Sequence, residues 1–150
     1  MGISIEESRR PLIAMRFDGE MSDALVQAHV EAVRGVLDRG ERFALIRDPS
    51  RVSGPPSALQ RRIMAQHFRE DRLRLARLWV GAAFLIPSSS LVRGALTAIL
   101  WIQPLPHPHT VVSNFESAEA WCRARLEDAG LTVPAVSERR NGRGSGQLAP

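Results

Sequence analysis

The chain has 150 residues, of which 44% are hydrophobic and 24% are charged, a composition typical of one folded globular domain. All 20 of its basic residues are arginine, which gives a net charge of +4 and a pI of about 11.0. The lack of lysine excludes a P-loop lysine and a Schiff-base lysine, and the single cysteine, Cys122, excludes an internal disulfide.

Two strands are predicted at the N-terminus. Residues 3–8 alternate apolar and polar side chains, as a half-buried strand does. Residues 10–17 carry apolar side chains on both parities, which is typical of a strand buried on both faces. The short reversal between the two strands favours an antiparallel hairpin, and Gly19 is expected to turn the chain after the second strand.

The spacing of apolar residues then changes to that of a helix. Over residues 23–39 they recur at intervals of four, three and four, with Ser22 as a cap at the start and Gly40 just past the end. A third strand is predicted over 42–48 and a second helix over 57–76. The stretch between these two elements is rich in Pro, Ser and Gly and is expected to be a turn.

The second half of the chain continues to alternate strands with helices. An almost unbroken apolar run over 77–87 predicts a central strand, and 88–102 predict a third helix with few polar positions. A short strand is predicted over 110–112 and a closing helix over 114–130. The composition then becomes polar and rich in arginine and glycine, so 137–150 are expected to form a disordered tail.

The predicted order is therefore β-β-α-β-α-β-α-β-α. Strands that alternate with helices form parallel neighbours through right-handed crossovers, and the hairpin adds one antiparallel strand. The sequence predicts an α/β fold with a mixed, mostly parallel five-stranded sheet and about four helices. A single domain is expected over residues 1–136.

Several short motifs accompany this order of elements. Asp48-Pro49-Ser50 closes the predicted third strand, and the second half carries Arg93-Gly94-Ala95-Leu96, Trp101, Pro104, Pro106, Phe115, Glu119, Ala120 and Trp121. With these motifs the chain resembles the STAS domains of anti-sigma-factor antagonists, and more closely the broad bacterial STAS-like group, over roughly residues 3–130. The resemblance implies a STAS-like fold and a module that docks onto a protein partner.

The resemblance also implies a serine switch at the start of the second helix. The antagonists carry an Asp-Ser-Ser/Thr-Gly motif there, where this chain has the sequence VSGPPS over 52–57. A phosphate on this stretch would lie near a helix N-terminus and several arginines, both of which favour an anion. Ordinary turn and capping chemistry is the alternative. The candidate residues of the switch are Asp48, Ser50, Ser53 and Ser57.

The predicted second helix is the most charged part of the chain. From Arg51 to Arg77 there are seven arginines and two acids, a local charge of +5. This segment is either a solvated face or a surface for an acidic protein partner. Nucleic acid is not favoured, because no aromatic stacking pair and no DNA-reading motif accompanies the arginines. The residues expected on this face are Arg61, Arg62, Arg69 and Arg72.

The third helix and its exit hold more apolar surface than one covered face requires. This surface is either buried by the closing helix, or it forms a patch for dimerisation or a pocket for an apolar ligand. The residues concerned are Leu96, Leu100, Trp101, Leu105 and Trp121. A pocket here would make the protein a carrier or sensor of an apolar or lipid-like small molecule.

The remaining features favour a protein without chemistry of its own. His107 and His109 lack a third metal ligand nearby, and the acids are scattered rather than paired, so no metal, no cofactor and no enzyme activity is expected. The N-terminus does not resemble a secretory signal, and the longest apolar stretches fall short of the about 20 residues of a membrane helix. We therefore predict a cytoplasmic, non-enzymatic regulatory module that binds a protein partner, with a homodimer left open.

Overall fold

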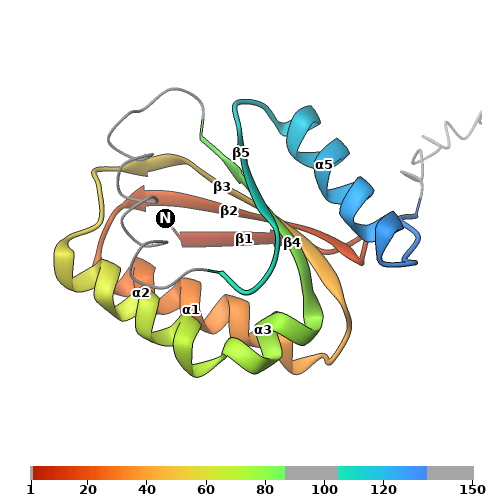
Figure 1. Ribbon diagram of the computed structural model, residues 1–150. Coiled ribbons are helices and arrows are strands. Elements are labelled where there is room, and N and C mark those ends of the chain that lie inside the picture. The colour runs from red at the N-terminus through yellow and green to blue at the C-terminus, as the bar shows by residue number, and fades with distance from the viewer. Residues whose placement is uncertain (1, 87–104, 135–150) are drawn as a thin grey trace, which may run out of the picture.

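Figure 1 shows the computed structural model of the protein, which describes residues 2–86 and 105–134. The predicted third helix (88–102) and the predicted tail (137–150) lie outside the described residues. The predicted domain boundary at residue 136 lies outside them as well.

The described residues form one five-stranded sheet. From one edge to the other its strands are β1 (Gly2–Glu6), β2 (Leu12–Glu20), β3 (Phe43–Ser53), β4 (Trp79–Leu85) and β5 (His109–Val112). Strand β1 runs antiparallel to β2, and every other neighbouring pair is parallel. The predicted hairpin and the predicted mixed, mostly parallel sheet are therefore confirmed.

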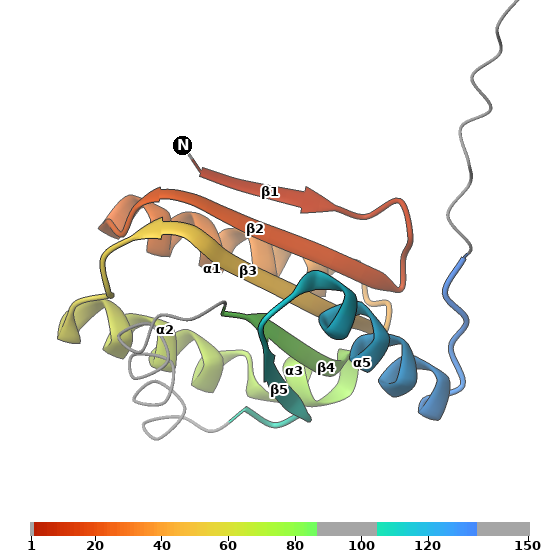
Figure 2. The same cartoon turned by 90° about the horizontal axis from the view of Figure 1, so that it is seen from above.

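Four helices in the described part cover this sheet. They are α1 (Asp23–Asp38), α2 (Ala58–Glu70), α3 (Arg72–Leu78) and α5 (Phe115–Asp128). Figures 1 and 2 show α1, α2 and α3 on one face of the sheet and α5 on the other. Helix α1 joins β2 to β3, and α2 and α3 join β3 to β4. Successive right-handed crossovers in one direction place their helices on the same face.

Side-chain caps begin α1, where Ser22 was predicted, and α5. The hydroxyl of Ser22 accepts a hydrogen bond of 3.1 Å from the backbone N–H of Leu25 in α1. The side chain of Asn114 accepts one of 2.8 Å from the N–H of Ser117 in α5. After α1, Gly40 adopts a φ of 69°, a conformation that glycine adopts without strain.

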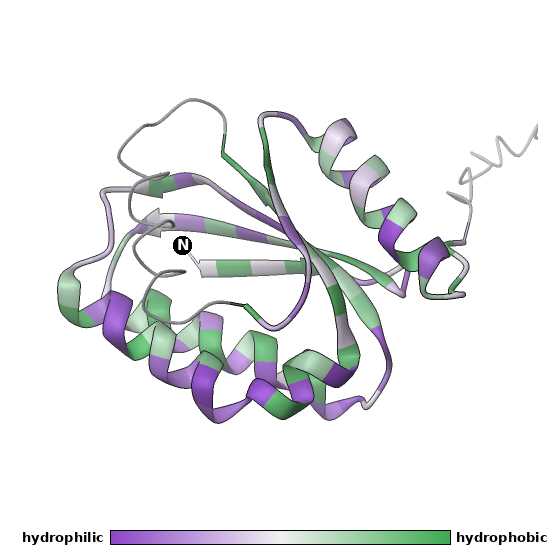
Figure 3. Ribbon diagram, viewed as in Figure 1, coloured by the Kyte–Doolittle hydropathy of each residue, from purple (hydrophilic) through white to green (hydrophobic). Residues whose placement is uncertain are grey.

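The strands bury alternate side chains on the two faces of the sheet, so the core has two layers. The layer under α1, α2 and α3 includes Ile13, Met15, Phe17, Val33, Phe43, Leu45, Phe68, Leu75, Trp79 and Phe84. The layer under α5 includes Leu12, Ala44, Ile46, Ala83, Ala118, Cys122 and Leu126. Figure 3 shows that β4, the strand between β3 and β5, is mainly hydrophobic. It also shows hydrophilic residues spread over the helices.

Strands β2 and β3 extend into two predicted turns. The turn predicted at Gly19 is wrong, because β2 continues through Gly19, with a φ of 111°, to Glu20. The turn predicted after residue 48 begins later, at Gly54, because β3 continues to Ser53. The two strands stay paired over this extension, where Glu20 lies opposite Ser53.

A bulge explains how β3 continues through a proline. Arg16 pairs with Asp48, but Asp18 pairs with Arg51, so two residues of β3 lie opposite one residue of β2. A bulge of this kind tolerates Pro49, which has no N–H to donate to the neighbouring strand.

The helix predicted over 57–76 is two helices, α2 and α3, separated at Asp71. Asp71 has a φ of −94° and a ψ of 7° and accepts a hydrogen bond of 2.9 Å from Nε of Arg34 in α1. A contact between distant parts of the chain thus holds the break against α1. Helix α3 extends the helical region to Leu78, so β4 begins two residues later than predicted.

Close packing of α5 on β4 leaves no room for a side chain at Gly81. A Cβ atom there would lie 3.0 Å from Cζ3 of Trp121 and 3.1 Å from Cγ of Arg125. We expect Gly81→Ala to lower the free energy of unfolding by about 1–3 kcal/mol, because α5 must move to accept the methyl group. Urea denaturation measures this change.

The matched control is Gly35→Ala. Gly35 lies inside α1, and a Cβ atom there would meet nothing within 4 Å. Alanine favours a helix interior over glycine, so this variant should gain about 0.5–1 kcal/mol. Equal effects of the two substitutions would contradict the packing described for Gly81.

Candidate functional site

Three residues of the predicted switch lie in strand β3 rather than in a turn. The carboxylate of Asp48 accepts a hydrogen bond of 3.0 Å from the backbone N–H of Ser50 and lies 3.9 Å from Nε of Arg16. Ser50 and Ser53 are exposed on the strand. The turn itself begins at Gly54, which has a φ of 79°. The structure therefore separates these residues from the start of α2.

Ser57, the fourth residue of the predicted switch, caps α2. Its hydroxyl accepts a hydrogen bond of 3.1 Å from the N–H of Gln60, and its own N–H donates to Oε1 of Gln60 at 2.9 Å. The amide of Gln60 also donates to Asp23 of α1 at 2.9 Å. Ser57 remains exposed in this arrangement, so its capping role is confirmed while its hydroxyl stays accessible.

The predicted basic face divides into one bound and three exposed arginines. Arg61 is partly buried and donates from Nη1 to the carbonyl of Pro56 at 2.9 Å. The exposed members, on the outer side of α2 and α3, are Arg62, Arg69 and Arg72. Two leucines, Leu59 at 63% exposure and Leu73 at 86%, lie on the same two helices. We call these three arginines and two leucines the α2–α3 face.

The acids of this segment are turned away from the α2–α3 face. Arg34 of α1 binds both of them, donating to Asp71 at 2.9 Å and to Glu70 at 3.0 Å. Arg74 donates back to Asp38 of α1 at 2.6 Å. These ion pairs link α1 to the α2–α3 break.

Two of the five residues of the predicted apolar patch lie within the described part of the chain. Leu96, Leu100 and Trp101 lie outside the described residues. Leu105 packs against the core layer under α1, α2 and α3, whereas Trp121 packs against the layer under α5. The sheet separates these two residues, so they do not line a common pocket.

The sequence analysis did not single out Arg47, which is a buried cation in β3. Its side chain is 8% exposed and donates from Nη2 to Nε2 of His29 in α1. Its guanidinium carbon lies 5.7 Å from the ring centre of Phe17 and 5.3 Å from that of Phe84. Burial lowers the pKa of Arg47 to about 10, so the group remains a cation at neutral pH.

Two buried histidines lie near Arg47. Burial, followed by the charges of Arg47 and His67, holds the pKa of His29 well below its ordinary value. His107 stacks on Trp79 with 4.4 Å between ring centres, and burial lowers its pKa to about 3. Both histidines are neutral at pH 7. Because side chains alternate along β3, Arg47 lies on the same face of the sheet as the buried residues two and four positions before it. This alternation could have indicated that Arg47 is buried.

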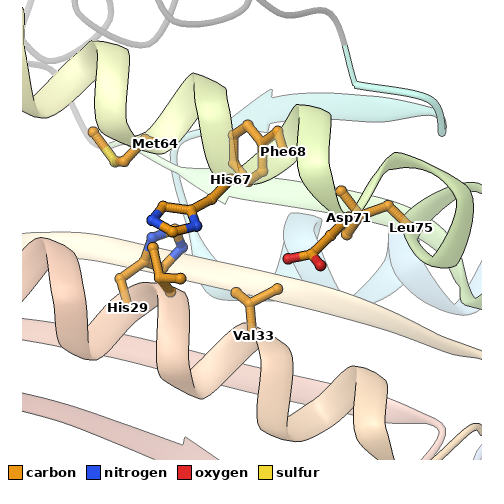
Figure 4. Close-up of a pocket in the computed structure, with 8 residues that line it drawn as sticks. His29, Val33, Met64, His67, Phe68, Asp71 and Leu75 are labelled. Carbon is orange, nitrogen blue, oxygen red and sulfur yellow. The ribbon is translucent and has the colours of Figure 1, made fainter.

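A small pocket lies between α1 and α2 (Figure 4). His29 lines it from α1, and Met64, His67 and Phe68 line it from α2. Its cavity volume is about 10 Å³, which is room for a single water molecule. This pocket is too small for an organic ligand, and no metal-binding group of three or more His, Cys, Asp or Glu occurs in residues 2–86 and 105–134.

The buried Cys122 packs under α5, where its thiol lies 3.9 Å from the carbonyl of Leu45. Burial raises the pKa of Cys122 to about 12. It is therefore a protonated core residue rather than a nucleophile. No helix within the described ranges is long and apolar enough to cross a membrane.

Two solved structures share this fold. One is an uncharacterised protein of the DUF3478 family from Shewanella loihica PV-4, described as having a SpoIIAA-like fold. It matches with a TM-score of 0.54 and 16% identity, over 81% of this chain and 94% of its own. The other is the anti-sigma factor antagonist SpoIIAA in its unphosphorylated form, with a TM-score of 0.52 and 16% identity, over 82% of this chain and 97% of its own.

These likenesses show that the chain has the SpoIIAA-like fold, so the predicted STAS-like architecture is confirmed. No family model matches the sequence. No curated protein matches it either.

The buried histidines make stability depend on pH. The folded pKa of His107 is about 3, below its ordinary value of 6.5, so the unfolded chain binds more protons between these two values. Stability is therefore lost as the pH falls through this range. Protonation of His107 alone should lower the free energy of unfolding by about 2 kcal/mol between pH 7 and pH 5, and His29 acts in the same direction.

Urea denaturation at pH 7, 6 and 5 measures this loss. His107→Phe keeps an aromatic ring against Trp79 but cannot be protonated. When the pH is lowered from 7 to 5, the stability of this variant should therefore decrease less than that of the wild type. His109→Phe is the comparison variant: His109 is exposed, and its charge is a smaller cause of the lowered pKa of His107 than burial is, so this variant should keep most of the pH dependence. Parallel pH profiles for the wild type and His107→Phe would show that His107 is not the titrating group.

Proposed function

We propose that the protein is a non-enzymatic regulatory module that binds an acidic segment of a protein partner. The α2–α3 face carries this proposal, because its three arginines are exposed while Glu70 and Asp71 are bound to α1. Positive charge of this kind attracts and orients a partner rich in Asp and Glu. The exposed Leu59 and Leu73 offer apolar contacts beside the charges.

The fold supports the same class of function. SpoIIAA, which has this fold, is by name an antagonist of an anti-sigma factor, so one protein with this architecture acts on a regulator. Within the described residues, the tiny pocket between α1 and α2 and the separation of Leu105 from Trp121 give no support to a carrier of apolar ligands.

We further propose Ser57, rather than Ser50 or Ser53, as the residue whose phosphorylation would control binding. Its hydroxyl is exposed at the N-terminus of α2, where the backbone N–H groups and the helix dipole favour a phosphate. Ser57 also begins the helix that carries the α2–α3 face. Two negative charges placed there would weaken the attraction of this face for an acidic partner.

Charge reversal tests the partner-binding face. The variant Arg62→Glu/Arg69→Glu/Arg72→Glu should capture the partner from a lysate of the source cells at least about tenfold less than the wild type does. The captured partner should carry an acidic segment. The matched control reverses the charge of three exposed arginines outside α2 and α3, namely Arg10, Arg16 and Arg42. Equal capture by both variants would refute the assignment of this face.

Phosphopeptide mapping of protein isolated from its native cells tests the switch. We expect phosphate on Ser57 and none on Ser50 or Ser53. Ser57→Ala should abolish the modification and, because it removes the cap of α2, lower the free energy of unfolding by about 1 kcal/mol. Phosphate found only on Ser50 or Ser53 would move the switch into β3 and overturn the proposal.

A further inference from the structure

Arg47 is a buried cation with no counter-charge among the described residues. No acidic residue within the described ranges lies within ion-pair distance of its guanidinium, and its hydrogen bond there goes to the neutral ring of His29. The undescribed segment 87–104 contains no Asp or Glu, and 135–150 contain only Glu138. A buried guanidinium normally pairs with a carboxylate or phosphate, because a buried charge without compensation is costly.

The described side chains around Arg47 are aromatic rings rather than acids. Its guanidinium contacts the faces of Phe17 and Phe84, which exclude water without neutralising the charge. The charge of Arg47 also contributes to the lowered pKa values of His29 and His107. Burial is the largest cause of both lowered histidine pKa values, and the charge of Arg47 acts in the same direction.

The topology places this charge where open α/β sheets bind their ligands. Arg47 pairs with Phe84, one residue before β4 ends at Leu85. Strand β3 continues beyond this level to Ser53, and Figure 2 shows β3 extending past the end of β4. Ligands of such sheets bind outside the carboxyl ends of the parallel strands.

We propose that Arg47 anchors a binding site for a small-molecule oxyanion, a carboxylate or phosphate group, at the carboxyl end of β4. The planar guanidinium presents paired N–H donors that match two oxygens of such a group. Burial between two aromatic rings strengthens the interaction, because water competes little there. The site lies in the sheet rather than on the α2–α3 face, so this inference goes beyond the proposed partner binding.

Thermal unfolding with inorganic phosphate, sulfate or acetate, each against chloride at equal ionic strength, tests the proposal. We expect an oxyanion at ten times its Kd to raise the Tm of the wild type by about 4 °C. A response to phosphate and sulfate but not acetate identifies a phosphate-type ligand, and the reverse identifies a carboxylate. No response to any of the three would overturn the proposal.

Arg47→Met separates a ligand site from a structural arginine. Without a counter-charge, Arg47 costs stability, so the variant should unfold in chloride at a Tm equal to or above that of the wild type and lose the oxyanion response. Arg16→Met, which removes an exposed arginine of β2, should keep the response. A full response in Arg47→Met would place the anion elsewhere and overturn the proposal.

A second measurement does not depend on the folding of the Arg47 variant. Phosphate titrated into the wild-type protein should shift the ring-proton NMR signals of His29 and His107 and leave those of the exposed His109 unchanged. Shifts confined to His109 would overturn the site. The Arg62→Glu/Arg69→Glu/Arg72→Glu variant should retain the effect, so failure of this inference and failure of the proposed function remain distinguishable.

Discussion

Strand β3 imposes the constraint on which the rest of the structure depends. Phe43 and Leu45 pack under α1, α2 and α3, while Ala44 and Ile46 pack under α5. Because side chains alternate along a strand, a shift of one residue would exchange the two layers, so the register is strongly specified. The next residue on the α1 side is Arg47, which must therefore enter the interior. The same packing that stabilises the sheet thus creates a buried cation.

A second consequence of the packing concerns charge on the outside of the molecule. Arg34 of α1 binds Glu70 and Asp71, and this contact joins the helices on one face of the sheet. Exposed ion pairs of this kind contribute little to stability individually. Their main effect here is on the distribution of charge, because they hold Glu70 and Asp71 against α1 while Arg62, Arg69 and Arg72 remain exposed. The surface potential that would attract a partner therefore depends on contacts made on the inner side of α2 and α3.

Local signals predicted the parts of the fold that depend on short stretches of sequence. The hairpin, the caps at Ser22 and Asn114 and the helical period of α1 each involve residues a few positions apart, so neighbouring side chains and turn geometry suffice to indicate them. The extension of β2 and β3 was missed because it depends on a bulge between strands that are far apart in sequence. Proline and glycine in β3 and β2 are typical of turns, and only pairing across the sheet keeps them in strands. Capping at the start of the second helix was one of the two alternatives that the local sequence offered, and Ser57 has this role. The burial of Arg47 was not predicted.

Local period, capping and composition were enough to predict the mixed sheet, the alternation of its described strands with helices and the basic character of the second helical region. Packing between distant parts of the chain was needed to show which serine stays exposed at a helix start, that Leu105 and Trp121 lie on opposite faces of the sheet, and that Arg47 is buried with no acid of the described residues within ion-pair distance. These features depend on which distant residues meet, and such meetings arise only when helices from both sides close over the sheet. A pattern along the chain can show that a residue is charged, but the surrounding packing determines whether that charge meets water, a carboxylate or neither.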